Sequence, residues 1–311
     1  MTKFFEADIP HMPGVGPIHI DEIKPTLARL EQSLGMDLQN WVLGSVGKKE
    51  FSGDIDVAVQ IRSPQEFEEL KQKVAASPVI IAHEPKGGLI LSSVMIVGYD
   101  ATKKSNDPKH GPRTGKVQVD FMPGGDPNWL RTYYHSPSRE ESQYKGVFRN
   151  ILISTIAAFY DREKSEETID DGRPVSVTRW KWGNNGLLRV ERKPKPKANG
   201  QGYTKANIDT VIGDPITDGD EVAQALGLDS VKDLNSYESL KLAMEKNYPE
   251  ELTQRILDSF AQNAQVQDIG VPDDLRSQAV NSLAEKQLNR IKQLAGLNLN
   301  STVMISGAFN K

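Results

Sequence analysis

A short run of alternating acidic and apolar residues, 54–59, constrains the fold of this chain more than any other feature. In a β-strand successive side chains point to opposite faces, so Asp54 and Asp56 share one face while Ile55 and Val57 lie on the other. Such a strand buries its apolar face and presents two oxygen ligands on its free face. Mg²⁺ binds oxygen ligands and keeps open positions for phosphate oxygens, so the pair predicts a metal site for nucleotide chemistry.

A third carboxylate, Asp120, lies in a second alternating run, residues 116–123, which also predicts a strand. If the two strands pair, Asp120 and Gln118 share a face and Asp120 reaches the same ions as Asp54 and Asp56. Three converging carboxylates can hold two metal ions. We therefore expect two Mg²⁺ ions at this point, with Mn²⁺ able to replace them.

The spacing of these residues resembles that of the DNA polymerase beta superfamily of nucleotidyltransferases, and most closely the catalytic core of the family X polymerases. The shared pattern comprises a Gly-Ser pair, a short spacer, Ser-Gly-Asp-x-Asp and a distant Asp, here Gly44, Ser45, Ser52, Gly53, Asp54, Asp56 and Asp120. The resemblance implies that the three carboxylates are both catalytic and metal-binding. It also implies a sheet that carries the carboxylates on one surface and is covered by helices on the other.

Residues around the Gly-Ser pair have implied roles in nucleotide binding. By the same resemblance, Gly44, Ser45 and Gly53 hold an incoming triphosphate and Lys48 neutralises its charge. A Lys where the family has Arg keeps the charge but loses the planar guanidinium fork. The offset along the chain places Tyr134 near the sugar and base.

The resemblance implies transfer of a nucleotide from a nucleoside triphosphate to an acceptor hydroxyl, with release of pyrophosphate. The expected acceptor is a nucleic-acid 3′-hydroxyl, as for a DNA polymerase or a terminal nucleotidyltransferase. Two alternatives stay open. The same core can nucleotidylate a small molecule or a protein side chain, or the domain can be a catalytically silent nucleotide-binding module.

The net charge of −4 argues against a nucleic-acid partner, but the charge is unevenly distributed. One basic stretch with interleaved aromatic residues runs through residues 179–205 and contains Arg179, Trp180, Lys181, Trp182, Arg189, Arg192, Lys193, Lys195, Lys197, Tyr203 and Lys205. A second basic loop spans residues 103–116 and contains Lys103, Lys104, Lys109, His110, Arg113 and Lys116. Both predict nucleic-acid contacts through phosphate attraction, and the first adds stacking. The Lys-Pro-Lys-Pro-Lys segment predicts an exposed extended arm.

Length and composition are ordinary for a globular protein. The chain has 311 residues, 37% hydrophobic and 26% charged, and no cysteine, which excludes disulfides and thiolate sites in this sequence. The start lacks the apolar core of a signal peptide, and no run approaches a membrane span, so we expect a cytoplasmic protein.

The pattern of elements predicts an α+β fold. A nucleotidyltransferase-type mixed sheet backed by helices is expected over residues 1–165. An accessory domain follows over residues 166–311, with a small β-hairpin and a mainly helical C-terminal region, and it resembles the thumb of the family X polymerases. Asp21 is the expected N-cap of a first helix over residues 21–34, and Ser63 precedes a second over 64–75. A later helix is expected over 139–160, with Arg139, Lys145 and Arg149 on a solvated face or in contact with substrate. The Gly-Asn-Asn-Gly sequence at 183–186 predicts the hairpin turn.

Overall fold

The computed structural model describes residues 12–86, 88–105, 111–160, 168–170, 173–197, 203–266, 271–272 and 275. The chain divides into two compact units, residues 1–256 and 257–311. All elements below belong to the first unit except the end of the last helix. The domain boundary near residue 165 stays a prediction. The sequence also predicts a helix over residues 272–295, and this range lies almost wholly outside the described residues. No described helix is both long enough and apolar enough to cross a membrane.

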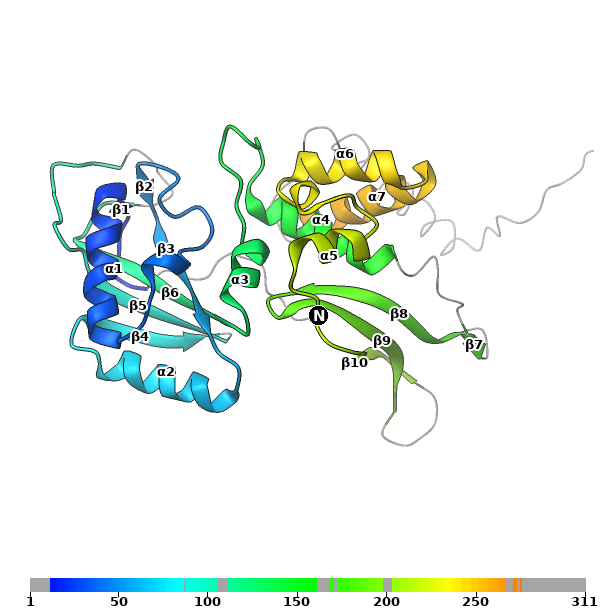
Figure 1. Ribbon diagram of the computed structural model, residues 1–311, viewed down its shortest axis with the longest axis horizontal. Helices are drawn as coiled ribbons and strands as arrows, with labels where there is room; N and C mark the ends of the chain where they lie inside the picture. The colour runs from blue at the N-terminus through cyan, green and yellow to red at the C-terminus, as the bar shows by residue number, and fades with distance from the viewer. Residues whose placement is uncertain are drawn as a thin grey trace, which may run out of the picture. The chain divides into compact units, whose positions relative to one another are not determined.

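The first sheet has four strands and mixed pairing (Figure 1). Its order is β3 (Asp54–Gln60), β6 (Lys116–Gly124), β5 (Leu89–Met95) and β4 (Ile80–Lys86). Strands β3 and β6 are parallel, whereas β6 with β5 and β5 with β4 are antiparallel. A small second pairing joins β1 (Ile18–His19) to β2 (Phe51–Ser52), just before β3. The expected pairing of the two carboxylate strands is therefore confirmed.

Helices α1 (Ile20–Leu34) and α2 (Pro64–Ala76) pack against one face of this sheet (Figure 1). Their buried stripes, which include Leu27 and Leu70, form one apolar cluster with strand residues such as Ile55 and Phe121. Apolar side chains of the strands therefore fill this face, and the carboxylates are left on the other.

The two helix starts differ in how well the sequence predicts them. Ser63 caps α2 as expected, since its side chain accepts a hydrogen bond from the backbone N–H of Glu66. Asp21 does not cap α1, because the helix begins one residue earlier and His19 is its N-cap, in a capping box with Glu22. Pro25 consequently lies inside the helix rather than in its first turn.

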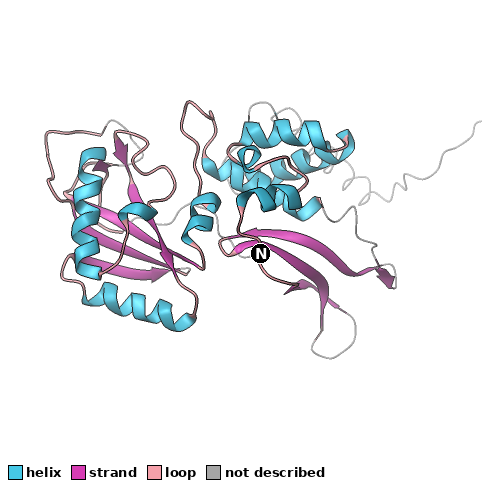
Figure 2. Cartoon of the chain, viewed as in Figure 1, coloured by secondary structure: helices cyan, strands magenta, loops and turns pink. Residues whose placement is uncertain are grey.

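A second sheet follows helices α3 (Pro127–Tyr133) and α4 (Gly146–Phe159). Its antiparallel strands run in the order β10 (Tyr203–Val211), β9 (Gly186–Pro196), β8 (Arg173–Gly183) and β7 (Thr168–Asp170). The hairpin turn at 183–186 is confirmed, because Gly183 and Gly186 are register partners in β8 and β9. The expected small hairpin is thus part of a larger sheet of four strands, drawn as magenta arrows in Figure 2.

The remaining described elements are helical. They are α5 (Gly219–Ala225), the 3₁₀ helix η3 (Val231–Leu234), α6 (Tyr237–Asn247) and α7 (Glu250–Val266). A further 3₁₀ turn, η1 (Gln39–Trp41), follows α1. The molecule is therefore a mixed α+β protein, with a mixed sheet and helices, as the pattern of elements predicts.

Candidate functional site

The register of β3 against β6 brings the three predicted carboxylates together. Asp56 is the register partner of Asp120, and Asp54 is the partner of Gln118. One carboxylate oxygen from each of Asp54, Asp56 and Asp120 lies within 4.8 Å of the others. Three anionic oxygens from two adjacent strands therefore converge on the sheet face opposite the apolar helix layer.

Asp120 is the most buried of the three, at 1% exposure. Its Oδ2 accepts a hydrogen bond from Gln118 Nε2 at 3.1 Å, while its buried Oδ1 has no hydrogen-bond partner among the described residues. Burial is the main cause that raises its pKa to about 7, and the nearby charge of Asp54 adds to the effect. A cation would compensate both causes, so the residues fit a hard divalent ion such as Mg²⁺ or Mn²⁺.

Asp54 and Asp56 are only half-buried, so the site is accessible from one side. The Gly-Ser turn lies directly against it. The backbone N–H of Leu43 donates to the Asp56 carbonyl at 2.9 Å, and a Cβ added to Gly44 would lie 3.4 Å from Asp56 Oδ2. Gly44 has a φ of +63°, a conformation that favours glycine. The turn and the carboxylates therefore form one local arrangement.

The residues after Gly44 form a tight loop with exposed side chains. The backbone N–H of Lys48 donates to the carbonyl of Ser45 at 3.2 Å, and the side chain of Ser45 is exposed. Gly53 lies at the bend between β2 and β3, immediately before Asp54. These positions suit contacts with a ligand above the carboxylates.

Lys48 already has a protein partner. Its Nζ donates to the backbone carbonyl of Ser136, in the loop that follows α3. Although part of the residue is exposed, burial around the ammonium group lowers its pKa, and nearby Glu141 opposes this change. A triphosphate contact through Lys48 would require it to exchange this carbonyl for a phosphate oxygen.

Tyr134 is half-buried and packs within the protein. Its ring makes an edge contact with Tyr133 at a centroid distance of 4.8 Å, and it borders the apolar cluster that contains Leu130 and Met122. These contacts give Tyr134 a packing role, and its role near the sugar and base stays a prediction.

Arg113 in the loop of residues 103–116 is a structural residue rather than a phosphate contact. It forms an ion pair with Glu22, and both side chains are 4% exposed. Its guanidinium also donates to the Asp100 carbonyl at 2.7 Å and lies over the ring of Tyr99. Lys103 pairs with Asp21 at 2.9 Å, and Lys109 and His110 lie outside the described residues.

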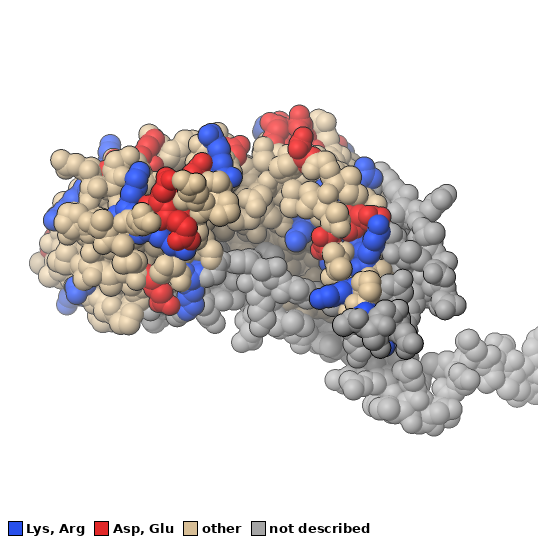
Figure 3. Space-filling model, turned by 90° about the horizontal axis from the view of Figure 1, so that it is seen from below, with Lys and Arg blue, Asp and Glu red and all other residues tan. Residues whose placement is uncertain are grey.

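Three cations of the stretch 179–205 are paired within the second sheet: Arg179 and Arg192 with Asp209, and the exposed Lys193 with Glu191 at 2.9 Å. Asp209 on β10 accepts two hydrogen bonds from Arg192 at 2.7 and 3.1 Å and lies 3.3 Å from Arg179. On the face drawn in Figure 3, Lys and Arg side chains lie among Asp and Glu side chains rather than in one continuous basic surface. The bases of this stretch, counted from the sequence alone, therefore overestimate its positive charge.

The sequence predicts that Trp182 is a stacking surface for bases, but this prediction is wrong. Trp182 is 6% exposed and packs on Trp129 and Tyr133. Trp180 stays half-buried, with the guanidinium of Arg189 over its ring.

The expected free arm is the end of strand β9. The pairing of β8 with β9 ends at Arg192, so beyond it β9 pairs with β10 alone. Pro194 and Pro196 lie in this part of β9, where a proline without an N–H group is tolerated. Lys195 and Lys197 are exposed there, as expected. The segment thus presents its lysines from a paired strand.

Arg149 matches neither role expected for it. It is 1% exposed and donates to the carbonyls of Thr132, Tyr133 and Leu234 and to Asn150 Oδ1. The helix begins only at Gly146, so Arg139 is an exposed loop residue and Lys145 is the N-cap. Sequence periodicity alone gives no signal for such a buried cation.

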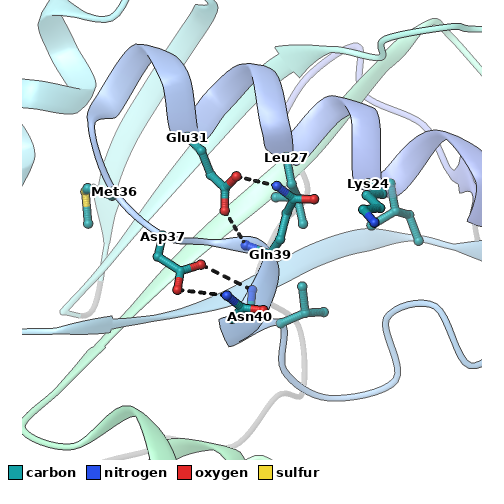
Figure 4. A pocket seen from close by; sticks show the side chains of 9 residues that line it. Lys24, Leu27, Glu31, Met36, Asp37, Gln39 and Asn40 are labelled. Atoms are coloured by element: carbon teal, nitrogen blue, oxygen red, sulfur yellow. Dashed lines mark hydrogen bonds between the residues drawn. The ribbon is translucent and has the colours of Figure 1, made fainter.

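A cavity of about 660 Å³ lies between α1 and the turn that follows it (Figure 4). Glu31 forms part of its wall and accepts hydrogen bonds from the backbone N–H groups of Leu38 and Gln39 at 2.7 and 2.8 Å. These bonds tie the turn to α1. Since α1 covers the apolar face of the sheet, this cavity is separate from the carboxylates.

The chemistry of the site is therefore defined by three converging carboxylates, one of them buried with an unpartnered oxygen, and by a Gly-Ser turn against them. This arrangement can hold a divalent cation. The case for a function comes from this geometry, because no protein-family model and no curated protein matches the chain.

Proposed function

We propose that this chain is a metal-dependent nucleotidyltransferase of the polymerase beta type, and that its first sheet is the nucleotidyltransferase sheet. The observation that carries the proposal is the convergence of Asp54, Asp56 and Asp120 within 4.8 Å, on a half-open face beside Gly44 and Ser45. A merely solvated pair of strand carboxylates would not require the buried and unpartnered oxygen of Asp120.

In this proposal Asp54, Asp56 and Asp120 would together hold two Mg²⁺ ions, and Asp120 would serve the ion that activates the acceptor hydroxyl. Bound magnesium supplies a lowered pKa for the attacking hydroxyl and charge neutralisation on the triphosphate. The Gly44–Ser45 turn and Gly53 orient the triphosphate through close backbone approach, and Lys48 contributes a positive charge. The acceptor hydroxyl loses its proton to water and its oxygen bonds to the α-phosphorus. The bond from the α-phosphorus to the oxygen that bridges to the β-phosphorus breaks, and pyrophosphate leaves with that oxygen.

The proposed acceptor is a nucleic-acid 3′-hydroxyl. Support comes from the exposed lysines at the end of β9, Lys193, Lys195 and Lys197, and from the cation–π pair of Arg189 and Trp180. We also propose a cytoplasmic location, since a chain without cysteine suits a reducing compartment.

A second acceptor class has specific support. Arg179 and Arg192 both pair with Asp209, and Arg113 is buried against Glu22, which removes cations on which nucleic-acid binding was predicted to depend. A small molecule or a protein side chain needs no basic groove. The site chemistry is the same for both classes.

The test incubates the protein with Mg²⁺ or Mn²⁺, each labelled nucleoside triphosphate, and a panel of primed duplex, single-stranded DNA and transfer RNA. The proposal is supported if labelled product is absent with Asp120→Asn and present with Asp37→Asn. Asp37 is the control because its carboxylate is exposed in the turn after α1. Products on protein or small molecules alone would select the second acceptor class. Failure of the wild type to bind any triphosphate with either metal would overturn the assignment.

A further inference from the structure

A chain of two hydrogen bonds connects the N-terminal loop to the carboxylate site. The backbone N–H of Met12 donates to Gln118 Oε1 at 2.7 Å, and Gln118 Nε2 donates to Asp120 Oδ2 at 3.1 Å. Gln118 has 0% exposure, so water does not compete for these bonds at its side chain. The connection joins a loop residue to a predicted metal ligand through one buried amide.

The orientation of this amide is determined by chemistry. A backbone N–H can only donate, so the oxygen of Gln118 must face Met12 and its NH₂ group must face Asp120. An NH₂ group favours the ionised form of the carboxylate it faces, and it engages only one of the two oxygens. The bond therefore restricts the rotation of the Asp120 carboxylate and leaves Oδ1 for another partner.

The loop that supplies the Met12 N–H is itself fixed against β6. The N–H of Gly16 donates to the carbonyl of Lys116, the first residue of the strand, at 2.9 Å. A Cβ at Gly16 would lie 2.5 Å from the carbonyl oxygen of Pro112, so the loop can approach this closely only with glycine. Met12 is thereby held at a defined position along the strand that carries Gln118 and Asp120.

We propose that Gln118 is a positioning residue for the metal site and that the loop of residues 12–17 is its support. Gln118 directs Oδ1 of Asp120 toward the cations shared with Asp54 and Asp56, and the Met12 N–H prevents the amide from turning away. This inference rests on the proposed function, since it assumes that the carboxylates bind divalent cations. Partners of this kind, behind the ligands, typically change metal affinity by about 10- to 100-fold when removed.

The first test measures the dissociation constant of Mn²⁺ by electron paramagnetic resonance, with a nucleoside triphosphate present. Gln118→Met keeps the side-chain length but removes both hydrogen bonds, and we expect it to weaken Mn²⁺ binding by about 10-fold or more. Ser93→Ala is the matched control, because Ser93 is the register partner of Gln118 on β5 and is 3% exposed. The control should stay within about twofold of wild type.

The second test changes only the loop. Met12→Pro removes the N–H donor and the Met side chain, whereas Met12→Ala removes the side chain alone. We expect Met12→Pro to bind Mn²⁺ about three- to tenfold more weakly than Met12→Ala, because the amide of Gln118 loses its anchor. This pair also decides the question if Gln118→Met fails to fold by circular dichroism.

The outcomes separate the two claims. Wild-type protein that binds no Mn²⁺ overturns the proposed function and this inference with it. The inference is overturned, and the proposed function stays intact, if folded Gln118→Met binds Mn²⁺ as tightly as wild type. If Gln118→Met does not fold, equal Mn²⁺ affinities of Met12→Pro and Met12→Ala have the same meaning. Weakened binding in the test variants, with Ser93→Ala unchanged, supports both.

Discussion

Asp120 combines burial, a neighbouring carboxylate and a single hydrogen-bond donor. Without a cation, ionising such a group is unfavourable, since both its loss of water and the charge of Asp54 oppose it. The protein therefore keeps an acid whose protonation responds near neutral pH. Its behaviour can be measured without any knowledge of the substrate.

The first prediction concerns stability in the absence of metal. The folded pKa of Asp120, about 7, lies above its ordinary value of 3.8, so the stability linked to its proton is complete below about pH 4 and lost as the pH rises through about 7. Asp120→Asn removes this dependence. The free energy of unfolding of the variant minus that of wild type should therefore increase by roughly 2 kcal/mol or more from pH 5 to pH 8.

Urea denaturation at both pH values, with EDTA, measures this gain. An excess of Mg²⁺ should reduce this increase, because the cation stabilises the ionised Asp120 of wild type more than it stabilises the Asn of the variant. A stability difference between the two proteins that is the same at pH 5 and pH 8 would contradict the raised pKa.

Arg149 is the second residue whose environment makes a sharp prediction. Burial lowers its pKa to about 9, so it remains charged at neutral pH, and its donors satisfy three backbone carbonyls and one side-chain amide. Arg149→Met would leave those carbonyls buried without donors. We expect a loss of roughly 3 kcal/mol or more in free energy of unfolding.

Arg139→Met is the matched control, because Arg139 is exposed in the preceding loop, and its change should stay within about 0.5 kcal/mol. Denaturation by urea compares the two variants. A loss below about 1 kcal/mol in Arg149→Met would show that other donors replace the guanidinium.

At the scale of elements, the sequence predicts best where the pattern is local. The alternation in β3 and β6, the Ser63 cap of α2 and the turn at 183–186 are visible in neighbouring residues, and the structure has them. The carboxylate pattern also predicts that the strands of Asp56 and Asp120 pair, whereas the parallel direction of that pairing is known only from the structure. The site was therefore predictable as a set of residues, although its metal-binding role stays a prediction.

The errors arise where distant residues decide the environment. Arg113 and Arg192 look like free cations because their acids, Glu22 and Asp209, come from other elements of the chain. Trp182 looks like a stacking surface because nothing near it in sequence reveals the rings of α3. Strand β10 has no clean alternation of apolar and polar residues, so the sequence does not identify it as a strand. It is recognised only from its pairing with β9 in the structure.

The Gly-Ser turn gives a prediction at this scale. Gly44 and Gly35 both have positive φ, +63° and +65°, but a Cβ meets Asp56 only at Gly44, and at Gly35 it meets nothing within 4 Å. Alanine at either position should lower the free energy of unfolding by about 1–2 kcal/mol through backbone strain. Only Gly44→Ala should also weaken binding of a triphosphate with Mn²⁺, by about fivefold or more (about 1 kcal/mol).

Isothermal titration calorimetry measures this binding for both variants beside wild type. Equal affinities for Gly44→Ala and Gly35→Ala would place the ligand away from the turn. Because backbone strain lowers the stability of both variants, a loss of affinity in Gly44→Ala alone is due to the added Cβ at the turn and not to strain.

At the scale of the whole molecule, the net charge of −4 opposes nucleic acid unless local cations overcome it. The exposed lysines at the end of β9 are the strongest described candidates. If a single-stranded acceptor contacts Lys193, Lys195 and Lys197, replacing all three by Ala should reduce the slope of log affinity against log salt by about 2.

A matched variant removes three lysines from helices α1 and α2, Lys24, Lys71 and Lys73, and should change the slope much less. Fluorescence anisotropy of a labelled oligonucleotide across a salt series measures both variants. Identical slopes would exclude the β9 lysines as contacts and favour the second acceptor class.

The parallel pairing of β3 with β6 has a practical consequence for engineering. Because β4 and β5 intervene in sequence, a polypeptide cut between β5 and β6 yields one fragment with Asp54 and Asp56 and another with Asp120. Neither fragment alone carries a complete ligand set. If the carboxylates bind metal as proposed, the halves, fused to two interacting partners, would recover that binding only when brought together, which is the behaviour of a split reporter.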